Sequence, residues 1–108
     1  MIEEGDETRE PRVASSPQDG LVRVLNIVNK KGLHARASAK FVQTAERFDA
    51  AVKVTRGQET VGGTSIMGLM MLGAGIGTKI TVEAAGNEAS AVLDALEKLV
   101  TSGFGEED

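Results

Sequence analysis

The spacing of apolar residues changes along the chain, and each change predicts a new element. Residues 21–29, LVRVLNIVN, alternate apolar and polar side chains and are rich in β-branched residues, which is typical of a strand. From His34 onward apolar residues recur every three or four positions, as in Ala37, Phe41 and Ala45, so one face of a helix is apolar. These two segments predict a strand followed by a helix.

The remaining segments continue this alternation of strands and helices. They are strands at 50–57, 58–63 and 78–85, a short apolar helix at 64–72, and a last helix between Gly86 and Gly103. The resulting order, β-α-β-β-α-β-α, predicts an α+β fold. Its four-stranded, mainly antiparallel sheet is expected to carry three helices on one face.

The length of 108 residues fits one domain with additional segments at its ends. Residues 1–20 contain six acidic residues, two basic residues and both prolines, without an apolar period. This composition predicts a disordered acidic leader. The domain is expected at 21–104, and an acidic tail at 105–108.

Several function classes are disfavoured by the composition. The chain has no cysteine and one histidine, so disulfides are excluded and we expect neither a metal site nor a cofactor. The N-terminus lacks a basic-then-apolar signal pattern, which favours a cytoplasmic protein. Residues 60–78 are uncharged over 19 positions but include six glycines, so a soluble turn–helix–turn unit is expected rather than membrane insertion.

His34 is the one histidine of the chain and lies in a basic segment, NKKGLHARASAK, at 29–40. If a helix begins directly after it, the unpaired N–H groups of the first turn and the helix dipole form a site for an anion such as phosphate. Arg36 can hold two phosphate oxygens through its planar guanidinium group. These residues fit a histidine that accepts a phosphoryl group. A solvent-facing N-cap histidine with incidental basic neighbours stays open as an alternative.

The net charge of −4 is unevenly distributed, because residues 21–105 carry about +3. Lys30, Lys31 and Lys40 gather near the histidine, and we expect them to contact an acidic partner. General nucleic-acid binding is disfavoured by this balance. An RNA-recognition domain shares the βαββαβ order, but it stacks bases on aromatic residues, and the chain has neither Tyr nor Trp.

The short helix at 64–72 contains more apolar residues than one buried face needs. Ile66, Met67 and Met70 are therefore candidates for an exposed, adaptable docking surface, while a fully covered core helix is the alternative. Ser65 is a candidate N-cap. A phosphate on Ser65 would add negative charge beside the apolar residues.

Together, GLHARAS (32–38) and TSIMGLMMLGAG (64–75) resemble the two motifs of the HPr family, the histidine-containing phosphocarriers of the bacterial phosphotransferase system. His34 and Ser65 are 31 residues apart, as in the family pattern. The resemblance covers about residues 21–104. It implies an open-faced β-sandwich, and we expect a monomer that carries a phosphoryl group covalently and is no complete enzyme.

The resemblance also implies roles for particular residues and partners. His34 would take a phosphoryl group from Enzyme I and pass it to an enzyme IIA protein, with Arg36 binding the phosphate. Ser65 matches the serine phosphorylated by the HPr kinase/phosphorylase where that enzyme exists.

One position departs from the pattern of the sugar-transport members, which have proline after the arginine where this chain has Ala37. Alanine keeps the helix start, because proline there mainly fixes φ. HARAS and VGGTSIMGLMML resemble the nitrogen-related or regulatory branch more closely. The alternative function is therefore a regulatory module whose phosphorylation state selects partners, without sugar transport.

Overall fold

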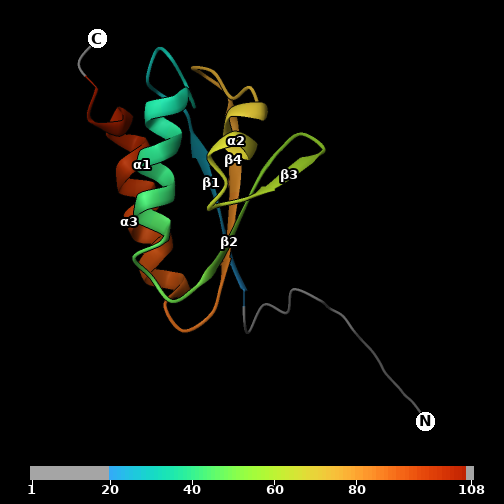
Figure 1. Cartoon of the computed structure of the whole chain (residues 1–108), viewed down its shortest axis with the longest axis vertical. Helices are drawn as coiled ribbons and strands as arrows, with labels where there is room; N and C mark the ends of the chain where they lie inside the picture. Colours follow the sequence, from blue (N-terminus) through green and yellow to red (C-terminus); the bar gives the residue numbers. More distant parts are fainter. Residues whose placement is uncertain (1–19, 107–108) are drawn as a thin grey trace.

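The computed structural model describes residues 20–106, and its elements follow the predicted order (Figure 1). They are β1 (Gly20–Asn26), α1 (Ala35–Ala45), β2 (Ala51–Arg56), β3 (Glu59–Gly62), α2 (Ile66–Met71), β4 (Lys79–Ala85) and α3 (Ala89–Thr101). A short 3₁₀ helix, η1 (Gly103–Gly105), follows α3 and was not predicted. The turn between β2 and β3 falls at residues 57–58, as expected.

The two predicted end segments are described only in part. Residues 1–19 of the predicted leader lie outside the described residues, while Gly20 already belongs to β1. Of the predicted acidic tail, Gly105 and Glu106 are described. The disorder of the leader therefore stays a prediction.

The sheet has the order β1-β4-β2-β3, and every neighbouring pair is antiparallel. β1 and β4 pair along their whole length, from Gly20 opposite Ala85 to Asn26 opposite Lys79. The long helices α1 and α3 lie side by side on the same side of the sheet (Figure 1). The predicted α+β, open-faced architecture is confirmed.

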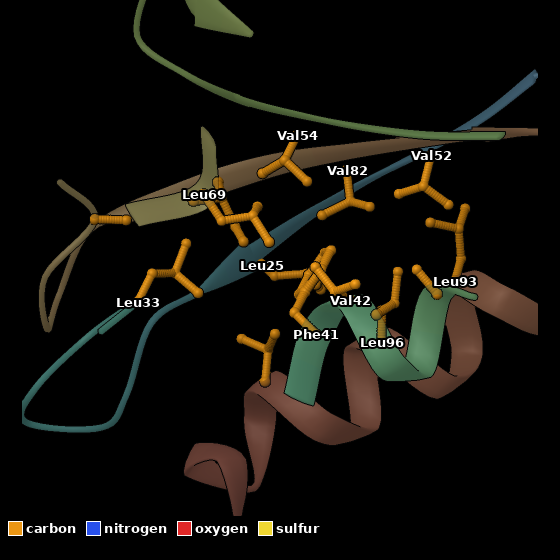
Figure 2. Close-up of a cluster of buried hydrophobic side chains, with 14 of the residues drawn as sticks. Leu25, Leu33, Phe41, Val42, Val52, Val54, Leu69, Val82, Leu93 and Leu96 are labelled. Atoms are coloured by element: carbon orange, nitrogen blue, oxygen red, sulfur yellow. The ribbon is translucent and has the colours of Figure 1, made fainter. Parts of the chain in front are cut away.

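The core lies between this sheet and the helices (Figure 2). In β4, Ile80, Val82 and Ala84 are buried and alternate with more exposed residues, as the period of a strand requires. Phe41 on α1 is fully buried in the same core cluster. Burial of one such large apolar side chain contributes about 1.5–3 kcal/mol. Phe48 was expected on the helical face, but it lies beyond the end of α1 and is half-buried against the core.

The loop before α1 packs against the loop after α2. Gly32 has φ = 64°, and a Cβ atom at this position would collide with the carbonyl oxygen of Ala74. The next residue, Leu33, donates its N–H to the same oxygen at 3.0 Å. The two sequence motifs, 31 residues apart between His34 and Ser65, are therefore joined through their flanking loops.

Within residues 20–106, no helix combines the length and the apolar character that crossing a membrane requires. The uncharged segment at 60–78 contributes α2, which has six residues.

Candidate functional site

His34 is the N-cap of α1 and has extended backbone angles, with φ = −74° and ψ = −178°. Its carbonyl oxygen accepts the first hydrogen bond of the helix, from the N–H of Ser38 at 2.8 Å. The N–H groups of residues 35–37 consequently have no partner within the helix. The imidazole makes no capping hydrogen bond, so it lies beside these N–H groups without accepting a hydrogen bond from them.

The imidazole opens into a surface depression with a volume of about 720 Å³. The depression is lined by Lys31, His34, Ala35, Arg36, Lys40, Gly105 and Glu106. Three cationic side chains and the first turn of a helix therefore surround one histidine. This arrangement can bind an anion next to the ring.

The carboxylate of Glu106 lies directly against the imidazole. Its Oε2 atom is hydrogen-bonded to Nε2 of His34, and its Oε1 atom accepts a hydrogen bond from Nδ2 of Asn29 at 3.1 Å. The hydrogen bond with His34 is the largest cause that lowers the pKa of Glu106 below its ordinary value, and Asn29 contributes as well. Glu106 is thus an ionised acceptor at neutral pH.

The turn at η1 brings Glu106 back to the start of α1. Phe104 has φ = 58° and is the one non-glycine residue with positive φ among residues 20–106. Its side chain is 1% exposed. Its carbonyl oxygen accepts a hydrogen bond of 2.7 Å from Nζ of Lys40. Lys40, predicted to contact a partner, therefore also holds this turn in place.

The predicted cations do not all line the same depression. Lys31, Arg36 and Lys40 line the depression of His34. Lys30 lines a neighbouring one of about 370 Å³, together with Val28 and Ile76. The site at His34 thus draws its basic character from three of the four cations nearest to it in sequence.

Ser65 is the N-cap of α2, as the sequence suggested, and its Oγ atom accepts a hydrogen bond from the N–H of Gly68 at 3.0 Å. The side chain of Ser65 is exposed. A Cβ atom at position 68 would lie 2.9 Å from that oxygen, so a larger residue there would force the hydroxyl of Ser65 to shift.

The apolar side chains of α2 lie on both sides of the helix. Leu69 is fully buried, whereas Ile66 and Met70 are each 40% exposed and Met67 is 68% exposed. Met71, which was not among the predicted docking residues, is 73% exposed. The alternative of a fully covered core helix is therefore wrong.

Over residues 20–106, no three His, Cys, Asp or Glu side chains are grouped so that they could hold a metal ion. The chemistry offered by the site is that of an anion-binding histidine.

Comparison with known proteins identifies the family. The family model described as "PTS HPr component phosphorylation site" matches residues 22–102. The chain belongs to the HPr family of phosphocarrier proteins.

The HPr relatives and structures match the chain almost over their full length. The phosphocarrier protein HPr of Cupriavidus necator is 49% identical over 86 residues, which are 80% of this chain and 97% of the relative. A phosphocarrier protein NPr from Shewanella violacea is 42% identical over 86 residues, 80% of this chain and 94% of the relative. A crystal structure of HPr from Thermoanaerobacter tengcongensis has a TM-score of 0.78 and 40% identity, over 82% of this chain and 99% of that one. Both the HPr and the NPr branches are thus represented.

Two residues of this HPr-type site were not predicted from the sequence. Asn29 donates to the carbonyl oxygen of Gly32 at 2.9 Å as well as to Glu106. Asn29 is 4% exposed and continues the series of alternate buried positions that begins with Leu25 and Ile27. A polar residue at such a position is a sequence signal for a hydrogen-bonded group with a structural role. Glu106 stands in a run of three acidic residues, and nothing in that run distinguishes it.

Proposed function

We propose that His34 accepts a phosphoryl group from Enzyme I and passes it to an enzyme IIA protein. Membership of the phosphocarrier family supports this general chemistry. The observation that carries the assignment to His34 is its position as the N-cap of α1 within the cation-lined depression. The helix N-terminus and Arg36 would hold the phosphoryl oxygens, since both present N–H donors to the same space.

The partners would dock on the apolar surface next to the depression. This docking surface consists of the exposed residues Ile66, Met67, Met70 and Met71 of α2. The loops flanking α1 and α2 are joined by the hydrogen bond from Leu33 to Ala74. A protein that covers the docking surface would therefore reach the basic residues around the imidazole, and an acidic rim on the partner would complement them.

A regulatory module is the second candidate function. The capping position and exposure of Ser65 support it, because a phosphate there would stand at the start of α2, beside the docking surface. The HPr kinase/phosphorylase would be the enzyme that adds this phosphate. Phosphorylation of His34 or Ser65 would then decide which protein binds, with or without sugar transport. Both functions would operate in the cytoplasm.

The two functions are separated by measuring phosphoryl flux and binding on the same variant. The chain is incubated with phosphoenolpyruvate, Enzyme I and a labelled enzyme IIA protein, with wild type compared to His34→Ala. Flux that depends on His34 supports the relay. Binding of regulatory partners that survives His34→Ala, without flux in the wild type, supports the module instead.

A further inference from the structure

The short helix α2 carries most of the sulfur of the chain. Of the four methionines, Met67, Met70 and Met71 stand within five positions on this helix. The chain has no cysteine, so there is no thiol to react first with an oxidant, and Trp and Tyr are absent as well. The thioether groups of α2 are therefore among the most readily oxidised groups of this protein.

These three methionines differ in exposure according to their rows on the helix. Side chains four residues apart lie on the same face of a helix. Met67 and Met71 form the outermost row, with 68% and 73% of their surface exposed. Met70 lies in the neighbouring row with Ile66, and both are 40% exposed. A small oxidant in solution therefore reaches Met67 and Met71 more readily than Met70.

The position of α2 depends on other residues. Leu69 is fully buried and points into the core (Figure 2). At the end of the helix, the carbonyl oxygen of the buried Leu72 accepts a hydrogen bond of 3.1 Å from the guanidinium group of Arg56. At its start, the hydroxyl of Ser65 caps the N–H of Gly68. These contacts involve no methionine side chain, so a change at the exposed sulfur atoms leaves the helix in place.

We propose that Met67 and Met71 form a site of reversible oxidation by peroxides, and that their sulfoxidation makes the docking surface polar without unfolding the domain. Weaker binding of partner proteins is the consequence. The oxidation is independent of what the protein binds, whereas its effect on partners rests on the proposed function. Methionine sulfoxide reductases restore the thioether, which makes the site a switch rather than a lesion.

The oxidation step balances with a hydroperoxide as the oxidant. A lone pair of the methionine sulfur attacks the terminal oxygen of the peroxide and forms the sulfur–oxygen bond. The oxygen–oxygen bond breaks, and its electron pair leaves with the second oxygen, which takes up a proton. Hydrogen peroxide yields water in this way. The sulfur is oxidised by two electrons and the peroxide is reduced by two.

The change in polarity acts on binding rather than on the chemistry at His34. A thioether packs as an apolar group and accepts hydrogen bonds only weakly. A sulfoxide oxygen is hydrated in water, and burial under a partner removes that water unless a donor replaces it. Among residues 20–106, no methionine lines the depression around His34. The reactivity of the imidazole toward a bound phosphoryl donor therefore stays unchanged, while the affinity for the donor protein falls.

The first arm of the test uses the full-length protein alone, treated with dilute hydrogen peroxide over time. Tandem mass spectrometry locates each added oxygen atom. We expect Met67 and Met71 to be oxidised before Met70, with an unchanged circular dichroism spectrum and shorter retention on a hydrophobic-interaction column. Equal or earlier oxidation of Met70, loss of helical signal, or unchanged retention would overturn the proposal. This arm needs no partner protein.

The second arm compares the double variant Met67→Leu, Met71→Leu with the matched control Met70→Leu. Leucine is apolar and similar in volume to methionine but has no sulfur to oxidise. Binding of Enzyme I is measured for each protein before and after peroxide, at a dose that leaves Met70 unoxidised in the wild type. Each protein thus serves as its own reference, and any effect of the substitution itself on binding cancels.

We expect wild type and Met70→Leu to bind Enzyme I roughly tenfold more weakly after treatment, as for burial of an unpaired polar group, and methionine sulfoxide reductases to restore binding. The double variant should bind equally before and after. An equal loss in the double variant, or unchanged binding by the oxidised wild type, would overturn the proposal. If the untreated protein does not bind Enzyme I, the proposed function fails, while the order of oxidation and the column retention still decide on the oxidation site.

Discussion

The ring of Phe104 holds the turn that delivers Glu106 to the imidazole, and its removal is predicted to cost much of the stability of the domain. The side chain is 1% exposed. A fully buried Phe→Ala change costs about 3–5 kcal/mol in the free energy of unfolding. For a domain of this size, that loss lowers Tm by about 12 °C or more. Equilibrium urea unfolding and thermal melts of Phe104→Ala measure both quantities.

The backbone of Phe104 adds a second, more specific expectation. Its φ of 58° is left-handed, and such a conformation costs an L-residue about 1–2 kcal/mol. Glycine avoids this cost, although it normally loses about 0.5–1 kcal/mol to alanine through chain entropy. Phe104→Gly should therefore be more stable than Phe104→Ala by up to about 1.5 kcal/mol, the reverse of the usual order.

Phe48 provides the matched control, because it is half-buried beyond the end of α1. Phe48→Ala should cost less than Phe104→Ala. The reasoning is refuted if Phe104→Ala lowers the free energy of unfolding by less than about 1 kcal/mol, because removal of a fully buried ring destabilises a protein by more than that. An alanine variant clearly more stable than the glycine variant would show that the turn is not left-handed in solution.

Three further predictions concern the two motifs and the new contact. Ser65→Ala should lower the free energy of unfolding by about 1 kcal/mol, because the N–H of Gly68 loses its hydrogen-bond acceptor. Ser65→Asp should keep the cap and the circular dichroism spectrum of the wild type, but its added charge should weaken Enzyme I binding. If Ser65→Asp unfolds, or is phosphorylated on His34 at the wild-type rate, charge at this position does not gate the site. Arg36→Lys should slow phosphoryl transfer without a change in Tm, because lysine lacks the two-pronged donor; an unchanged rate would mean that backbone N–H groups alone hold the phosphate. Folding lowers the pKa of Glu106, chiefly through its hydrogen bond with His34, so its stabilising contribution is present above the ordinary glutamate pKa and lost as pH falls through the folded value. Urea midpoints of wild type and Glu106→Gln should therefore differ at neutral pH and converge in acid, and a gap that persists in acid would contradict this assignment.

The order of elements could be predicted because each strand and helix has its own apolar period. In β4 the alternation of Ile80, Val82 and Ala84 is visible in the sequence, and the structure buries these residues. The start of α1 was also predictable, since the apolar period changes directly after His34. Its end was less so, because Phe48 continues the spacing of the helix but packs on the core from beyond it.

The residues that make up the site were predictable only where they are close to His34 in sequence. Lys31 and Arg36 stand within three residues of the histidine in sequence, and they line the same depression. Glu106 reaches the imidazole across 72 residues, and that distance is closed only by the packing of α3 and the turn after it. Gly103 indicated an end to the helix, but not the direction in which the chain would continue.

Phosphorylation of His34 is tested most directly by intact-protein mass spectrometry after incubation with phosphoenolpyruvate and Enzyme I. The wild type should gain the mass of one phosphoryl group, and brief acid treatment should remove it, because a phosphate on an imidazole nitrogen is acid-labile. His34→Ala should gain nothing under the same conditions. A phosphoryl group that survives acid, or one that appears on His34→Ala, would contradict the assignment of His34 as the carrier residue.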